Sequence, residues 1–152
     1  MEISAFTNDM QSSVCEFFEK CFAALGIPFS PSDRHADIAD IEGYYMHCGC
    51  FRCLWDDSVL VGTAALRVMD AEDGVAELKR MFVLPEYQGR GCGRLLLNHA
   101  IGYAKEQRYS RICLDTRREL SAAQHLYRSS GFTEIERYND NERAELFFEL
   151  VL

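Results

Sequence analysis

Residues 87–94 read YQGRGCGR and bring three glycines, Gly89, Gly91 and Gly93, into five positions. Glycine tolerates a left-handed backbone and lets another molecule approach the main chain closely, because it has no Cβ atom. This spacing therefore indicates a sharply bent loop whose backbone contacts something else. A plain structural turn is the alternative.

Segments with regular patterns flank this loop on both sides. The preceding stretch, ELKRMFV at 77–83, is typical of a strand, and Pro85 stops it. The following stretch, RLLLNHAIGYAKEQR at 94–108, has apolar residues at helical spacing. In this order of elements, the free N–H groups and the positive dipole end of the helix face the loop. The arrangement favours a bound anionic group such as a phosphate.

The charge of the chain changes sign around the loop. The 152 residues carry 16 basic and 24 acidic side chains, a formal net charge of −8. Between Lys79 and Arg94, four basic residues stand against Glu86 alone, a local net charge of +3. An acidic chain repels a nucleic-acid backbone in general, whereas a small basic region attracts a compact anion. We therefore expect a small anionic ligand and no nucleic acid.

The spacing of the glycines excludes two common phosphate loops. A G-x-G-x-x-G motif counted from Gly89 would need a glycine where Arg94 stands, and no G-K-[ST] triplet of a Walker A loop occurs in the chain. The remaining pattern is Gln88-x-x-Gly91-x-Gly93. In its strand-loop-helix context it resembles the central motif [Q/R]-x-x-G-x-[G/A] of the GNAT superfamily of acetyl-CoA-dependent N-acetyltransferases.

A second stretch strengthens this resemblance. LYRSSGF at 126–132 is similar to the later signature of the family, in which a helix ends in a tyrosine followed a few residues on by Gly-Phe. The resemblance is specific from Val75 to Phe132, while the first 50 residues match the family only in element order. It implies an enzyme that transfers an acetyl group from acetyl-CoA to an amine.

The order of predicted elements indicates a mixed α/β (α+β) fold with a partly antiparallel sheet and a late right-handed crossover. With the resemblance, it implies a single GNAT-like domain over residues 1–152, whose twisted, mostly antiparallel mixed sheet has helices on both faces. We expect strands at 2–6, 51–55, 58–68, 75–84, 111–116 and 142–152, helices at 94–108 and 121–131, a helix capped by Asn8 or Asp9 and ended by Gly26, and a short helix around 33–42.

The composition indicates the cellular compartment in which the protein is expected. No apolar run approaches the roughly 18 residues that a membrane span requires, and MEISAFTNDMQ has no basic segment leading into an apolar one. Seven cysteines are an odd number, and several fall in predicted helices or strands, which favours reduced thiols. We expect a soluble cytoplasmic protein without a membrane partner, and the sequence leaves a homodimer open.

The resemblance implies how acetyl-CoA would be held. The N–H groups of the glycine loop would bind the pyrophosphate, and the end of the preceding strand would pair with the pantetheine arm. Cys92 lies at a helix N-terminus, where thiolate character is favoured, so it is also a candidate for modification. Arg90 and Arg94 suit the phosphates, with solvated side chains as the alternative. The expected donor-binding residues are Met81, Phe82, Val83, Gln88, Gly89, Arg90, Gly91, Cys92, Gly93 and Arg94.

The resemblance also implies two catalytic residues. Some family members have a glutamate at the position of Glu77 that acts as general base, directly or through water. Strand alternation would put Glu77, Lys79, Met81 and Val83 on one face, so a salt-bridged or solvated Glu77 is the alternative. Tyr127 resembles the proton donor to the coenzyme A thiolate, with a buried packing role as its alternative.

Two further features concern the donor. The backbone from Met81 to Val83 would polarise the acetyl carbonyl, as the strand bulge of the family does. Many family members have an asparagine seven residues before the tyrosine, contacting the pantetheine, whereas this chain has Leu120. That contact is therefore not carried over.

The acceptor is expected to be a small-molecule amine shaped by the first half of the chain. A pI of about 5.0 favours a cationic amine, such as a polyamine, an aminoglycoside or a lysine side chain. A protein amine and a non-catalytic coenzyme A-binding module are the alternatives. The residues we expect around the acceptor are Phe29, Tyr44, Tyr45 and Tyr138.

A third interpretation is a metal-binding interaction protein. HCGCFRC at 47–53 has soft ligands close together, but one residue separates Cys48 from Cys50 and no second pair with zinc spacing is near. We expect thiols beside a strand and no metal. His99 and His125 fall in predicted helices and are expected to be packing or surface residues.

Overall fold

The computed structural model describes residues 1–47 and 49–152. The predicted elements are present, and a short strand, β6, is added, whose three residues are too few to show a periodic pattern. In chain order the elements are β1 (Glu2–Ala5), a 3₁₀ turn (Asn8–Met10), α1 (Gln11–Ala24), α2 (Ala36–Ala39), a π-helical turn (Glu42–Met46), β2 (Gly49–Asp56), β3 (Val59–Asp70), β4 (Val75–Val83), a 3₁₀ turn (Pro85–Tyr87), α3 (Cys92–Glu106), β5 (Arg111–Thr116), α4 (Ser121–Ser129), β6 (Thr133–Ile135) and β7 (Leu146–Val151).

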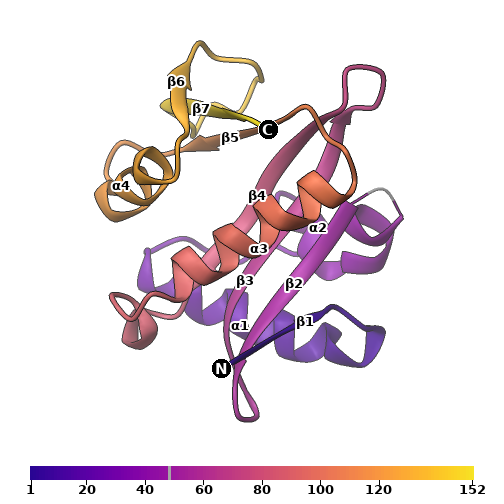
Figure 1. Ribbon diagram of the computed structural model, residues 1–152. Coiled ribbons are helices and arrows are strands. Elements are labelled where there is room, and N and C mark those ends of the chain that lie inside the picture. The colour runs from indigo at the N-terminus through magenta and orange to yellow at the C-terminus, as the bar shows by residue number, and fades with distance from the viewer. Residues whose placement is uncertain (48) are drawn as a thin grey trace.

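The strands form one sheet in the order β1-β2-β3-β4-β5-β7-β6. Among the described strands, the neighbours β4 and β5 are parallel and the other neighbouring pairs are antiparallel. Helix α3 crosses one face of the sheet, and α1 and α2 lie behind the other (Figure 1). This architecture confirms the predicted mixed, mostly antiparallel sheet with helices on both faces.

The core divides into two clusters, one on each face of the sheet. Leu96 and Leu97 of α3 are fully buried in the first cluster, which also includes α4 and β7 residues. Phe18 of α1 and Phe51 of β2 are fully buried in the second. Cys50 belongs to the first cluster and Phe51 to the second, as the alternation of a strand between two helical layers requires.

Strand β4 contains a bulge at Arg80. Thr63 and Ala65 of β3 lie opposite Phe82 and Lys79, so β4 has one residue more than its partner over this stretch. Arg80 takes a left-handed conformation with φ +50°. The extra residue shifts the alternation of every side chain that follows it.

The bulge overturns one prediction about the faces of β4. Leu78 and Met81 pack in the same cluster, below α3, although three residues separate them. Glu77 and Lys79 therefore lie on the opposite face from Met81, together with Phe82, and not beside it as simple alternation predicts. The prediction that Glu77 and Lys79 share a face is correct.

The ends of helix α1 match the sequence only in part. Gly26 follows the helix with φ +67°, as predicted, and its N–H group donates to the Ala23 carbonyl at 3.1 Å. Neither Asn8 nor Asp9 caps the helix, because these residues form a 3₁₀ turn and the Asp9 side chain accepts a hydrogen bond from Thr7 Oγ1.

The six cysteines that the structure describes are free, and all but Cys15 are buried. Cys48, part of the 47–53 motif, lies outside the described residues. Within the described ranges, no helix is both long and apolar enough to span a membrane.

Candidate active site

The glycine loop presents a row of free amide groups. Gly89 and Gly91 have φ values of +73° and +84°, a conformation that residues with a side chain rarely adopt. Gly91 is the N-cap of α3, and no side chain caps the helix. In the described chain, none of the N–H groups from Gly89 to Arg94 donates a hydrogen bond to another residue. Six unpaired donors at a helix N-terminus form a favourable site for an anion.

Side chains tie this loop to its surroundings. Gln88 Nε2 donates to the Val83 carbonyl at 3.1 Å and so fixes the loop to the end of β4. The Arg90 guanidinium lies 5.0 Å above the Tyr87 ring, and Arg94 Nη2 donates to Ser129 Oγ of α4 at 2.8 Å. Both arginines are exposed, so their positive charge lies at the loop surface.

Two residues of the loop are fixed by packing. The Cys92 side chain is 2% exposed and lies in the cluster below α3. Its thiol is therefore closed to solvent, contrary to the expectation that it is open to modification, and only its amide faces the loop. A Cβ atom at Gly93 would approach Leu126 Cδ2 to 3.2 Å and Met81 Cε to 3.7 Å. The glycine allows α3 to begin close to both α4 and β4.

Strands β4 and β5 separate after a short parallel contact. The pairing joins Val75–Glu77 of β4 to Arg111–Cys113 of β5 and extends no further. Beyond this point β4 continues to Val83 while pairing with β3 on its other side. The edge of β4 that contains Met81 has no strand partner in the part of the chain that the structure describes. Such an edge offers main-chain donors and acceptors to an extended ligand.

Glu77 lies at the point where the two strands separate and is 1% exposed. Its Oε1 accepts a hydrogen bond from Arg67 Nε at 2.8 Å, and Arg67 Nη2 lies 2.7 Å from the same oxygen in an ion pair. Its Oε2 accepts from the Tyr138 hydroxyl at 2.7 Å, and Lys79 Nζ lies 3.6 Å away. The ion-paired alternative from the sequence is thus present, whereas a solvated Glu77 is excluded by its burial.

A second carboxylate extends this polar cluster. Asp115 Oδ2 of β5 lies 3.6 Å from Lys79 Nζ and accepts from Asn139 Nδ2 at 2.7 Å and from Asn141 Nδ2 at 3.3 Å. Burial, followed by the charge of Glu77, raises the pKa of Tyr138 well above its ordinary value. The Tyr138 hydroxyl therefore stays protonated and donates a hydrogen bond to Glu77 over the whole physiological range.

Sequence reasoning had missed Arg67 and Asn139 as partners of Glu77. Arg67 is the direct cross-strand neighbour of Glu77, so a register prediction for the hairpin β3–β4 would have found it. Asn139 reaches Glu77 Oε2 at 3.4 Å from the irregular segment before β7, where no periodic pattern places it.

Tyr127 of α4 is 7% exposed and packs beside Phe132 and Phe148. Burial, followed by the charge of Asp115, raises its pKa to about 12. Its hydroxyl has no hydrogen-bond partner among the described residues. Among the described residues, Arg52 Nε is the one fully buried side-chain polar atom without a hydrogen-bond partner. The unpaired Tyr127 hydroxyl is therefore not fully buried and retains some contact with solvent. The Tyr127 ring thus has the buried packing role given as the alternative, while its hydroxyl stays available to a ligand.

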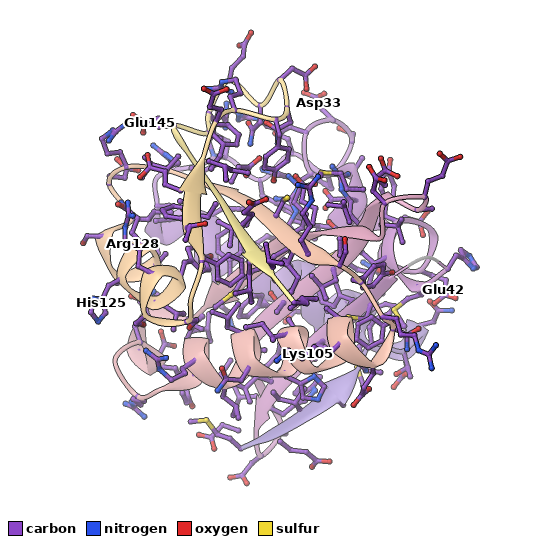
Figure 2. The ribbon with its side chains drawn as sticks, turned by 45° about the horizontal axis from the view of Figure 1, so that its top comes forward. Asp33, Glu42, Lys105, His125, Arg128 and Glu145 are labelled. Atoms are coloured by element: carbon purple, nitrogen blue, oxygen red, sulfur yellow. The ribbon has the colours of Figure 1, made fainter. Side chains whose placement is uncertain are left out.

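An open cleft of about 560 Å³ lies between the segment after α1 and the segment before β7. Asp33 and Glu145, one from each segment, lie at the same end of the molecule (Figure 2). The residues that line the cleft are Leu25, Gly26, Ile27, Pro28, Arg34, Arg117, Glu142, Arg143 and Glu145.

None of the four aromatic residues predicted around an acceptor lines this cleft. Tyr45 is 3% exposed and donates its hydroxyl hydrogen to Asp37, so it belongs to the core. Tyr44 is exposed at the surface, and Phe29 stacks on Phe22 and His35. Tyr138 instead contacts Glu77. Of the four, Tyr138 lies beside the candidate base Glu77, whereas Tyr45 is a core ring, because residue type alone does not distinguish a core ring from a pocket ring.

The histidines and the described residues of the 47–53 motif form none of the hydrogen bonds or ion pairs of the polar cluster. His99 and His125 are exposed on their helices, and Figure 2 labels His125 at the outer surface of α4. Among the described residues, no three His, Cys, Asp or Glu side chains come together as a metal site. Cys48 is outside that description.

Comparisons with known proteins agree with this geometry. Residues 12–132 match the model of the acetyltransferase (GNAT) family. The chain belongs to this family, and the resemblance inferred from its two motifs is confirmed.

Curated relatives share part of the chain. It is 40% identical over 80 residues to an uncharacterized N-acetyltransferase of Dictyostelium discoideum, covering 51% of this chain and 37% of that protein. It is 38% identical over 100 residues to the N-acetylaspartate synthetase of Rattus norvegicus, covering 64% of this chain and 33% of that protein. The chain thus spans about a third of the length of these relatives.

Solved structures match over nearly the whole chain. An acetyltransferase from Streptococcus agalactiae superposes with a TM-score of 0.88 at 26% identity, covering 99% of this chain and 98% of that one. The putative acetyltransferase yncA of Salmonella typhimurium, solved with its cofactor acetyl-CoA, gives a TM-score of 0.77 at 21% identity, covering 99% and 93%. The second likeness concerns the fold alone.

Proposed function

We propose that this protein transfers an acetyl group from acetyl-CoA to a primary amine of a small molecule by direct attack. The observation that carries the proposal is the free edge of β4 beside six unpaired amides of the glycine loop. An extended pantetheine arm matches the edge, and a pyrophosphate matches the amides. Family membership supports acetyl-CoA as the donor.

The side chains around the loop fit the same donor. Arg90 and Arg94 would place two positive charges beside the phosphates, with Arg94 held by Ser129. The bulge at Arg80 turns the backbone that follows it. The amides of Met81 and Val83 alternate with the β3-facing groups of Phe82 and Leu84, so they are candidates to polarise the thioester carbonyl. Leu120 stands at the N-cap of α4 and offers no side-chain hydrogen bond to the pantetheine.

Acetyl transfer needs a neutral amine, because an ammonium has no lone pair to attack the thioester carbon. We assign the removal of the amine proton to Glu77, with the Tyr138 hydroxyl as the relay. That hydroxyl donates to Glu77 Oε2 at 2.7 Å, and its oxygen can accept a proton from the amine as its own proton moves to the carboxylate. The relay gives a fully buried carboxylate access to the substrate.

The departing thiolate of coenzyme A needs a proton as the C–S bond breaks. We assign this proton to the Tyr127 hydroxyl, which has no other partner among the described residues. A phenol with a pKa of about 12 is fully protonated at neutral pH and so is always ready to donate. The name of the rat relative, an N-acetylaspartate synthetase, supports acetylation of a small-molecule amine.

The assay is release of free thiol from acetyl-CoA with a panel of small amines and a lysine-containing peptide. Tyr127→Phe and Tyr138→Phe should each lower the rate by about 10²- to 10⁴-fold, the range for loss of one proton-transfer group. The rise in melting temperature with acetyl-CoA should stay unchanged. Tyr44→Phe is the matched control, because Tyr44 is 53% exposed and its hydroxyl makes none of the polar cluster's hydrogen bonds.

Glu77→Gln needs a separate control, because it also breaks the ion pair with Arg67. Arg67→Gln removes the same pair but keeps the carboxylate. If both variants lose the same activity, Glu77 acts by positioning its neighbours and not as a base.

A non-catalytic coenzyme A-binding module is the second candidate, and one observation favours it. Both oxygens of Glu77 already accept hydrogen bonds, from Arg67 and Tyr138. Thermal stabilisation by acetyl-CoA without turnover of any amine would support this candidate over the enzyme. If acetyl-CoA gives neither stabilisation nor turnover, the donor assignment is wrong.

A further inference from the structure

The cleft between the segments after α1 and before β7 is unusual for this acidic chain, because three arginines line it. They are Arg34, Arg117 and Arg143, and the acidic residues of the lining are Glu142 and Glu145. The lining has a net positive charge, whereas the whole chain carries −8. An anionic group therefore finds a favourable position here that most of the surface does not offer.

Two of these arginines have no internal partner among the residues that the structure describes. Within residues 1–47 and 49–152, neither the Arg34 nor the Arg143 guanidinium forms an ion pair or hydrogen bond. Arg117 Nη2 lies 2.7 Å from Glu119 Oε1, so its charge is partly compensated. An unpaired guanidinium presents donors in a planar fork that matches a carboxylate.

The cleft adjoins the polar cluster around Glu77. Arg117 lies two residues after Asp115, a separation of at most about 7 Å along an extended chain. Asn141 donates to Asp115, and the next residue, Glu142, lines the cleft. The Glu145 amide donates to the Thr116 carbonyl at 3.0 Å, which holds this wall against the end of β5. A small molecule in the cleft thus has its other end near the expected reacting groups.

We propose that the cleft binds the carboxylate of the acceptor, so that the acceptor is an amine bearing a carboxylate, such as an amino acid or a short peptide. Arg34 and Arg143 hold the carboxylate, and the acidic residues of the lining favour the nearby ammonium. This inference rests on the proposed acetyltransferase function. It replaces the expectation of a cationic amine, because a polyamine would bring further positive charge against the arginines.

The test compares acceptors that differ only in the carboxylate. L-leucine and 3-methylbutylamine form one such pair, and L-phenylalanine and phenethylamine form another. A hydrogen bond to a charged group contributes about 1.5–3 kcal/mol, so loss of the carboxylate should lower kcat/KM by about tenfold to hundredfold. The loss should appear in KM more than in kcat, because the carboxylate is unchanged in the reaction.

Substitution of the two unpaired arginines tests whether they bind the carboxylate. Arg34→Gln and Arg143→Gln should each raise KM for the amino acids about tenfold or more and leave the simple amines unchanged. Arg118→Gln is the matched control, because Arg118 is an exposed neighbour of Arg117 that does not line the cleft.

The possible failures are distinguishable. If simple amines are acetylated as well as the amino acids, or the Arg34 and Arg143 variants affect both classes equally, the carboxylate inference is wrong and the enzyme assignment stands. If no amine of either class is acetylated, the proposed function itself fails.

Discussion

Replacement of Asp37 by asparagine tests the link between helix α2 and the bulge of β4. The Asp37 carboxylate accepts hydrogen bonds from Arg80 Nε at 2.7 Å and Nη2 at 2.6 Å, and the two side chains are 15% and 20% exposed. Removal of one partner of a buried ion pair costs about 3–5 kcal/mol, because the other charge is left unpaired. Residual exposure and the bonds that an amide oxygen still accepts reduce this cost, so we expect about 2–3 kcal/mol.

Arg80 allows the strain in the bulge to be measured separately. Arg80→Ala and Arg80→Gly both remove the ion pair, but only glycine accepts a φ of +50° without strain. The glycine variant should therefore be about 1–2 kcal/mol more stable than the alanine variant. Denaturant unfolding followed by far-UV circular dichroism gives the free energy of unfolding for each protein.

Two results would refute this reasoning. A loss below about 1 kcal/mol for Asp37→Asn, the value of an exposed ion pair, would show that the pair does not hold the bulge. Equal stability of the two Arg80 variants would show that residue 80 does not keep the strained left-handed conformation once the ion pair is lost, contrary to the predicted difference. In the first case the amides after Arg80 would owe their orientation to another contact.

Three further predictions concern pH and the loop. Burial alone would raise the pKa of Asp37, but the hydrogen bonds and charge of Arg80 outweigh it and lower that pKa. The stabilisation is therefore present above the unfolded value of about 3.9 and lost as pH falls through the folded value, so acid titration of unfolding should flatten in Asp37→Asn. Gly91→Ala should cost about 1–2 kcal/mol through its φ alone, since nothing crowds the new Cβ, and unchanged stability would contradict this. Tyr127, with a pKa of about 12, should ionise only above about pH 11, so an ultraviolet titration in which Tyr127→Phe removes a transition near pH 10 would contradict its burial.

Local patterns were sufficient for the part of the fold around the glycine loop. The strand before the loop, the glycines with positive φ and the helix after them are consecutive in the chain, so propensity and periodicity act on the same segment. The two motifs of the family lie in this region and its continuation to Phe132. Recognition of the fold therefore needed no long-range information.

The bulge at Arg80 lay beyond such reasoning. A non-glycine residue with a positive φ is locally unfavourable, and its stabilising partner, Asp37, lies 43 residues earlier in the chain. Strand alternation consequently assigned Met81 to the wrong face. A local rule fails where a tertiary contact supplies the compensating free energy.

The surroundings of Glu77 were predictable only in part. The ion-pair alternative was weighed with Lys79, but the closer partner is Arg67, and the hydroxyl of Tyr138 comes from a position 61 residues away. The arginines of the cleft come from three separate segments, and none belongs to a recognisable motif. Such sites depend on how loops meet, which sequence periodicity does not describe.

The separation of β4 from β5 also affects how the protein avoids unwanted association. An unpaired strand edge ordinarily recruits strands from other chains and so promotes aggregation. Here the open edge is interior to the sheet, and the Lys79–Asp115 contact at 3.6 Å limits the opening at one end. The open edge thus lies between two strands of the same sheet, where a strand from another chain has less access than at an outer edge. The unpaired main-chain edge of β4 thus lies inside the sheet. The strands at the outer edges, β1 and β6, are only four and three residues long.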